Sequence, residues 1–270
     1  MTEFDFSRIP STPPSVFVAP LQRPSHLGDD WLEPQQRRYS VDENRLWDEL
    51  FERQQRLLPG RACQAFVDGL ERLDLGRGGV PSFERVNESL LPMTGWQVVP
   101  VPMLIPDAVF FYHLANRRFP VGNFIRTRDQ FDYVQEPDVF HDLFGHVPLL
   151  TDPVFANYMA AYGRAGWKAL KYNRLKALSA LYWYTVEFGL IRESGSLRIY
   201  GAGILSGPTE TRFSLEGRSP HRIHLNVDRV MRTDYEISDL QATYFVVESF
   251  AELFHMTEQR GFEPIYESIA

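Results

Sequence analysis

The sequence predicts an α+β fold that is mostly α-helical, in one large domain with a small β region. Apolar residues recur at helical spacing over most of residues 41–192, whereas short extended patterns with glycines begin near residue 197. No internal repeat or linker divides the chain. Its 270 residues, 44% of them hydrophobic and 14% aromatic, can form and fill one large core.

Residues 1–40 are expected to form an extended arm that lies over the folded domain of residues 41–270. The arm is rich in proline, which has a fixed φ and no backbone N–H and therefore interrupts helices and strands. The N-terminus carries acidic residues and lacks the apolar segment of a secretory signal.

Helices are expected to follow one another through the first two-thirds of the domain. Asp42 can cap the first, and Pro59 with Gly60 ends it; Pro81 with Ser82 begins the third. Residues 119–134 are expected to be extended or irregular. The expected helices begin near residues 42, 62, 81, 106, 137, 152 and 174, and the last of them ends near residue 192.

A β region is expected after the last of these helices. Residues 197–205 predict a strand that bends at Gly201 and Gly203, with more short strands up to about residue 236. The run ATYFVVESFAELFHM then predicts a strand or helix start followed by a helix.

Composition excludes several classes of protein. The formal net charge of −7 argues against a general nucleic-acid binder, which has a basic face, and against attachment to anionic lipid. No window approaches the roughly 18 apolar residues of a membrane span. The single cysteine, Cys63, leaves no disulfide framework and suits a core position. The default expectation is a cytoplasmic protein.

The most informative segment is QEPDVFHDLFGHVPLL, which places His141 and His146 among apolar residues. Residues five apart on an ideal helix lie about 140° from each other. Both imidazoles could therefore reach one metal ion only if the helix is distorted, or if the site lies across its end; Gly145 offers backbone freedom there. The spacing alone leaves ordinary core or surface histidines as the alternative.

Glu187 lies in the aromatic run LYWYTVEFGL. Burying an unpaired carboxylate costs several kcal/mol. Glu187 must therefore face solvent, pair with a cation such as Lys171, Arg174 or Arg192, or bind a metal. Two imidazoles and one carboxylate form the facial triad of non-haem Fe(II) oxygenases, and they also suit zinc. A zinc-dependent hydrolase and a metal-stabilised binding module are thus the alternatives from other classes, although no H-E-x-x-H motif occurs.

Four sequence blocks in order carry a resemblance: FIRTRDQFDYVQEPDVFHDLFGHVPLL, ALYWYTVEFGL, YGAGILSG and YFVVESF. At these blocks the chain resembles the pterin-dependent aromatic amino acid hydroxylases, and among them the short bacterial members that act on phenylalanine. The resemblance implies a catalytic domain that hydroxylates L-phenylalanine at C4 to L-tyrosine with Fe(II), O2 and a tetrahydropterin. Tyrosine or tryptophan is the alternative substrate within the family. A monomer or weak dimer is expected.

The resemblance also implies a role for individual residues at three parts of an active site. His141, His146 and Glu187 would be the iron ligands. The substrate side would comprise a carboxylate-binding arginine, two walls of the aromatic pocket and a polar group at its edge: Arg126, Pro137, Trp183 and Ser206. Without the resemblance, Arg126 would be interpreted as a surface arginine or as one paired with Asp138. The pterin side would comprise a stacking ring and two neighbours: Phe110, Asp142 and Tyr182. Val134 departs from the family, whose animal members have a threonine there, so one substrate contact is in doubt.

Overall fold

The computed structural model describes residues 32–33, 35–76, 78–237 and 239–269. Most of the arm expected at residues 1–40 therefore lies outside the described residues. Its last part has no helix or strand and is bound to the domain: the N–H of Glu33 donates to the carbonyl of Pro100 at 3.0 Å. The described part contains no helix that is both long enough and apolar enough to span a membrane.

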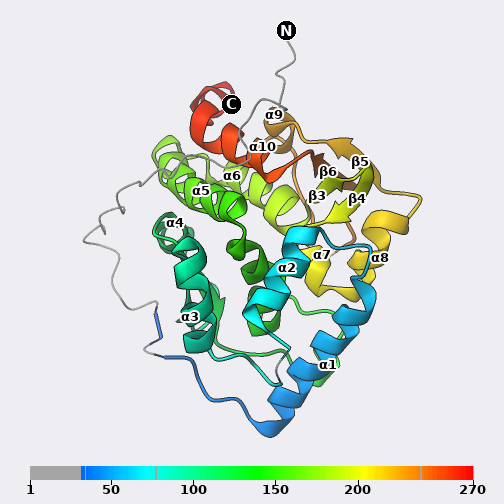
Figure 1. Cartoon of the computed structure of the whole chain (residues 1–270). Coiled ribbons are helices and arrows are strands. Elements are labelled where there is room, and N and C mark those ends of the chain that lie inside the picture. Colours follow the sequence, from blue (N-terminus) through cyan, green and yellow to red (C-terminus); the bar gives the residue numbers. More distant parts are fainter. Residues whose placement is uncertain (1–31, 34, 77, 238, 270) are drawn as a thin grey trace.

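Helices make up most of the described structure, and a small sheet lies at the upper right in Figure 1. The α-helices are α1 Val41–Leu57, α2 Gln64–Leu73, α3 Phe83–Thr94, α4 Asp107–Ala115, α5 Pro153–Tyr172, α6 Leu175–Tyr182, α7 Ala202–Ser206, α8 Pro208–Glu216, α9 Val227–Val230, α10 Phe250–Phe254 and α11 Glu263–Ser268. Wider π-helical turns cover His141–His146, Trp183–Glu187 and His255–Arg260, and 3₁₀ turns cover Arg128–Gln130 and Val147–Thr151.

The strands form two sheets. In the smaller, β1 (Gln97–Val101) and β2 (Arg118–Gly122) pair in parallel on either side of α4 in the sequence. In the larger, the order is β4-β3-β6-β5, where β3 (Leu190–Glu193) and β4 (Ser196–Ile199) form an antiparallel hairpin. The strands β5 (His221–His224) and β6 (Thr243–Val247) extend that sheet in parallel.

Helix α5 organises the core because small residues let its neighbours approach closely. It contacts α4 on one side and α10 on another. A Cβ at Gly163 would overlap the backbone of Ala115 in α4, so only glycine permits that crossing. Asp152 caps the first turn of α5 by accepting two backbone N–H groups at 2.9 Å, as expected for a helix that starts there. Cys63 is fully buried, as predicted.

The residue predicted to cap the N-terminus of the first helix was wrong. Ser40, and not Asp42, caps α1: its hydroxyl accepts the N–H of Glu43, and the Glu43 carboxylate accepts the N–H of Ser40 at 2.7 Å. This reciprocal capping box satisfies two end groups at once, which a lone Asp42 in the first turn does not do.

Two further expectations after residue 187 were wrong. The helix predicted to reach residue 192 ends at Glu187, and Leu190–Glu193 is strand β3. The strand predicted over residues 197–205 ends at Ile199, and Ala202–Ser206 is helix α7. Gly189 and Gly201 explain both changes, because a Cβ at either would overlap backbone or a tyrosine ring where the chain crosses itself. The strand and helix predicted in residues 239–260 are present as β6 and α10.

Candidate active site

The two histidines lie on a π-helix, His141–His146, which supplies the distortion that their spacing requires. In this helix the i→i+5 hydrogen bonds widen each turn, so residues five apart lie near the same side. The two Nε2 atoms are 3.1 Å apart. Gly145 matters here less for backbone flexibility than for the close approach of this helix to α7, because a Cβ at Gly145 would lie 3.0 Å from the carbonyl oxygen of Ala202.

Glu187 ends a second π-helix, Trp183–Glu187, which continues directly from α6. Its carboxylate faces both imidazoles: one oxygen lies 3.1 Å from Nε2 of His146, and the other lies 3.5 Å from Nε2 of His141. The structure therefore brings together the three side chains that the sequence suggested as metal ligands.

These separations fit the coordination of one metal ion. Bonds of about 2.1 Å from metal to nitrogen or oxygen place ligand atoms about 3.0 Å apart at right angles and about 3.4 Å apart in a tetrahedron. The two observed separations of 3.1 Å lie in this range, and the third, 3.5 Å, lies slightly above it. The donor set, two imidazoles and a carboxylate, is that of non-haem Fe(II) sites. The distances alone suit zinc equally well.

Charges at the site favour an ionised carboxylate. Burial opposes the charged form of Glu187, but the neighbouring imidazoles of His146 and His141 outweigh burial and hold the pKa of that carboxyl below its usual range. A deprotonated carboxylate is the form that binds a metal.

Ser206 fixes the orientation of one ligand ring. Its hydroxyl donates to the carbonyl of Ala202 at 2.8 Å, and its oxygen lies 3.0 Å from Nδ1 of His141. A serine hydroxyl has one proton, so its oxygen must accept from Nδ1–H. That tautomer leaves the lone pair on Nε2, which is the atom that faces His146 and Glu187.

Asp142 is a second carboxylate beside the same histidines. Its ligand oxygen lies within 4.8 Å of donor atoms of His141 and His146. One of its oxygens, however, accepts the N–H of Gly122 at 2.7 Å, and burial raises its pKa to about 6. Because Glu187 lies closer to both imidazoles and is held ionised, Glu187 is the better third ligand.

A cavity of about 230 Å³ opens beside these ligands. Phe110 of α4, Tyr182 at the end of α6, and Pro137 line it, and the rings of Phe110 and Tyr182 meet edge to face at 5.7 Å. The loop between β1 and α4 forms an outer wall of the cavity, which was not predicted from the sequence. That wall includes Met103, Leu104, Ile105 and Asp107.

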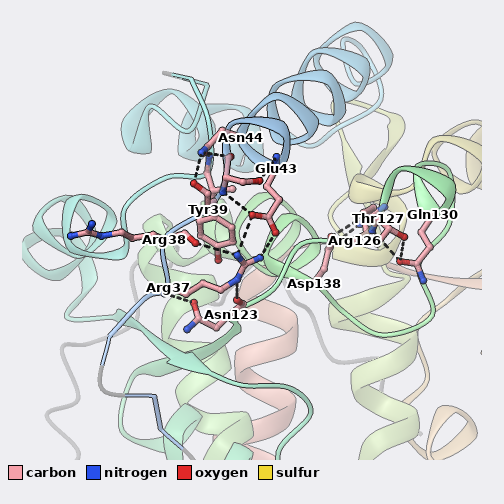
Figure 2. Close-up of polar contacts among 12 residues, drawn as sticks. Arg37, Arg38, Tyr39, Glu43, Asn44, Asn123, Arg126, Thr127, Gln130 and Asp138 are labelled. Carbon is pink, nitrogen blue, oxygen red and sulfur yellow. Dashed lines mark hydrogen bonds and ion pairs between the residues drawn. The ribbon is translucent and has the colours of Figure 1, made fainter.

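Arg126 does not line this cavity. It is buried, and its Nε and Nη2 donate hydrogen bonds to the Asp138 carboxylate at 2.9 and 2.8 Å. Its backbone N–H donates to the same carboxylate at 2.9 Å (Figure 2). Burial opposes the charge of Asp138, but Arg126 holds its pKa below the usual range. The ion pair with Asp138, which the sequence offered as an alternative for Arg126, is therefore present. It uses Nε and Nη2 of the guanidinium and leaves Nη1 without a contact to Asp138.

Trp183 also lies away from the cavity, in an aromatic stack between Phe188 and Tyr235 with ring centroids 4.6 and 4.8 Å away. Its indole N–H donates to the side chain of Gln241 at 2.9 Å. Neither Tyr235 nor Gln241 carries a local sequence signal, since each reaches Trp183 only through the fold.

Comparison with known proteins assigns the family. The family model described as biopterin-dependent aromatic amino acid hydroxylase matches residues 34–263. The phenylalanine-4-hydroxylase of Ralstonia nicotianae is 54% identical over 241 residues, which is 89% of this chain and 77% of that protein. The phenylalanine-4-hydroxylase of Caulobacter vibrioides is 56% identical over 232 residues, 86% of this chain and 79% of that protein.

Solved structures agree with this match. The phenylalanine hydroxylase of Chromobacterium violaceum with bound iron and phenylalanine has a TM-score of 0.85 and 51% identity, covering 90% of this chain and 89% of that chain. The same enzyme with iron(III) and 7,8-dihydrobiopterin has a TM-score of 0.85 and 52% identity, covering 90% and 88%. The chain belongs to the biopterin-dependent aromatic amino acid hydroxylase family.

Proposed function

We propose that this chain is a phenylalanine 4-monooxygenase, which hydroxylates L-phenylalanine at C4 to give L-tyrosine. One oxygen atom of O2 enters tyrosine, and the other leaves on a hydroxypterin formed from the tetrahydropterin. The observation that carries the proposal is that His141, His146 and Glu187 converge at a cavity walled by Phe110 and Tyr182. The relatives named phenylalanine-4-hydroxylase support the choice of substrate.

In this proposal His141, His146 and Glu187 hold Fe(II) through Nε2, Nε2 and the carboxylate. The ion and the tetrahydropterin would supply the oxygen chemistry and the two electrons that side chains cannot. The chain itself holds the ligand atoms 3.1 to 3.5 Å apart and keeps Glu187 ionised. Family membership favours this centre over the zinc hydrolase and the metal-stabilised binding module.

On the pterin side, Phe110 offers a ring face in the cavity, with Tyr182 and Asp142 beside it. Asp142 is oriented by the N–H of Gly122, which leaves its other oxygen for a ligand. A carboxyl with a pKa of about 6 can exchange a proton near neutral pH, so Asp142 suits a hydrogen-bonding partner of the pterin ring.

On the substrate side, Arg126 would bind the carboxylate of phenylalanine. The Asp138 fork holds the guanidinium plane rigid, and Nη1 remains to donate to the substrate. Pro137 and Trp183 would wall the aromatic ring. Ser206 was expected from the sequence to be a polar group at the edge of the substrate pocket. In this proposal it would act only indirectly, by orienting the ring of His141.

The compartment and the oligomeric state are also part of this proposal. We place the reaction in the cytoplasm and expect a monomer or weak dimer. A single buried cysteine, which needs no oxidising compartment, suits that setting.

The test is a comparison of substrates. Purified protein is supplied with Fe(II), a tetrahydropterin and O2, together with phenylalanine, tyrosine or tryptophan, and products are identified by mass spectrometry. We expect the highest kcat/KM with phenylalanine and tyrosine as product. A higher kcat/KM with tryptophan or tyrosine would reassign the substrate within the family, and turnover with zinc in the absence of pterin would refute the proposal.

A further inference from the structure

Residues 122–126, here called the bridging segment, join the two sides of the active site. At one end Gly122 lines the cavity and donates its N–H to the Asp142 carboxylate at 2.7 Å. At the other end Arg126 donates to the Asp138 carboxylate through its backbone and its side chain. The position of this segment therefore sets the cavity wall at Gly122.

Arg37, which precedes α1, binds the bridging segment at Asn123 (Figure 2). Its backbone N–H donates to Oδ1 of Asn123 at 2.9 Å, and its Nε donates to the carbonyl of Asn123 at 2.6 Å. The side-chain amide of Asn123 in turn donates to the carbonyl of Gln35 at 3.3 Å. Asn123 is buried; its carbonyl and its side chain are bound by this short stretch of chain, whereas its N–H donates to the carbonyl of Val101 in β1 at 2.8 Å.

The other edge of the Arg37 guanidinium is anchored to α1. Its Nη2 and Nη1 atoms donate to the two oxygens of Glu43 at 2.7 and 3.2 Å. Glu43 is itself fixed, because it closes the capping box with Ser40. Arg37 thus connects a rigid helix end to Asn123. Lysine cannot replace it, since one ammonium group does not donate along two edges of a plane.

The two ends of the bridging segment do not depend on Arg37 equally. Arg126 is secured by its own three hydrogen bonds to Asp138, and its neighbour Arg128 pairs with Glu49 of α1 at 2.7 Å. Gly122 has no side chain and is adjacent to Asn123, so release of Asn123 shifts the cavity wall more than it shifts Arg126.

We propose that Arg37 is a positioning residue for the pterin cavity, which acts through Asn123 and Gly122 on the wall that faces Asp142. This inference rests on the proposed function in one respect: the cavity beside the metal ligands is taken to bind the tetrahydropterin. No contact between Arg37 and the ligand is implied.

The test compares Arg37→Lys with Arg38→Lys. Arg38 is the matched control, because it is the next residue, is exposed, and points away from the network in Figure 2. The affinity of the iron-loaded protein for tetrahydrobiopterin is measured by calorimetry without amino acid, and the KM values for pterin and phenylalanine are measured separately. Loss of a charge-assisted hydrogen bond predicts a pterin Kd and KM raised about three- to tenfold by Arg37→Lys. The phenylalanine KM should change less than twofold, and Arg38→Lys should match the unmodified chain.

A second substitution separates positioning from general destabilisation. Asn123→Ala should weaken pterin binding to a similar extent, and the double variant should be no worse than the poorer single one, because both act on one path. Equal increases in both KM values would overturn the inference, as would a lowered Tm with unchanged pterin affinity, or additive effects in the double variant. If the unmodified protein binds the pterin but forms no tyrosine, the proposed function fails while the calorimetric comparison still tests Arg37.

Discussion

The side chains around the proposed metal ligands decide which ligand atoms would face the ion. His141 has two ring nitrogens, and the oxygen of Ser206 determines which one carries the proton. Metal-binding histidines depend on such partners, whose loss costs about 10- to 100-fold in metal affinity. In the proposed function Ser206 therefore belongs to the metal centre, although it is not one of the proposed ligands.

Ser206→Ala should lower the affinity for Fe(II) or Co²⁺ by about tenfold or more, because the ring of His141 loses its acceptor. Competition with a chromophoric chelator measures this directly. Ser214→Ala is the control, since Ser214 is also buried but its hydroxyl has no partner among the described residues. Equal affinities of the two variants would contradict the role assigned to Ser206.

Glu210 provides a pH-dependent prediction away from the metal. It is buried, it accepts hydrogen bonds from the N–H of Gln241 and the hydroxyl of Tyr244, and burial raises its pKa above the usual value of 4.5. A raised carboxyl pKa means that its stabilising contribution is complete below the ordinary pKa and is lost as pH rises through the folded-state pKa.

Glu210→Gln should therefore gain stability relative to the unmodified chain as pH rises from 4.5 towards 8, because glutamine keeps an acceptor oxygen and never ionises. Urea unfolding at several pH values gives the difference in unfolding free energy. A difference that stays constant over this range would show that Glu210 does not titrate as described.

The roles of some of these residues could be predicted from the sequence, and those of others could not. The triad could be suggested because His141, His146 and Glu187 are chemically conspicuous in apolar surroundings. Asp138 was visible as a partner for Arg126. The contact between Gln241 and Trp183 joins positions 58 apart in the chain, and nothing local to either residue indicates it.

At the level of elements, the site depends on two π-helices. Their wide turns bring His141 and His146 to one side and place Glu187 at the last position before the chain turns towards β3. An ideal helical period describes neither element, so periodicity predicted helices there without their geometry. The helical segment predicted over residues 174–192 was wrong at its end, because Gly189 and Gly201 let the chain cross itself after Glu187.

Gly201 makes a close contact between elements at the backbone of Glu187. Its φ of −67° would suit alanine, but a Cβ there would overlap the carbonyl oxygen of Glu187. Gly201→Ala should therefore cost about 1–3 kcal/mol of unfolding free energy and lower metal occupancy. Thermal unfolding and metal analysis measure the two effects.

Gly207→Ala is the control for this substitution. The φ of Gly207 is −109°, and a Cβ there would meet only the carbonyl oxygen of Gly203, at 3.1 Å. We expect a smaller loss of stability and full metal occupancy. If both alanine variants retain the metal equally, the close approach of residue 201 to Glu187 is not what holds the ligand in place.

At the scale of the molecule, segments far apart in the sequence meet around one cavity. The loop after β1, helix α4, the bridging segment, the first π-helix and the end of α6 all contribute to its lining. The family resemblance indicated Phe110 of α4, the first π-helix and the end of α6 as parts of one site, but the loop after β1 and the parallel pairing of β1 and β2 were not predicted. Such pairing depends on contacts across α4 and has no local pattern.

The proposed reaction at this cavity and its metal ligands inserts one atom of O2 into phenylalanine. Mass spectrometry of the tyrosine formed by the Fe(II)-loaded protein with a tetrahydropterin under ¹⁸O2 tests this reaction directly. We expect one ¹⁸O atom in each tyrosine, and no product when Fe(II) or the pterin is omitted. Tyrosine without the label, or its formation in the absence of the pterin, would contradict the proposed reaction.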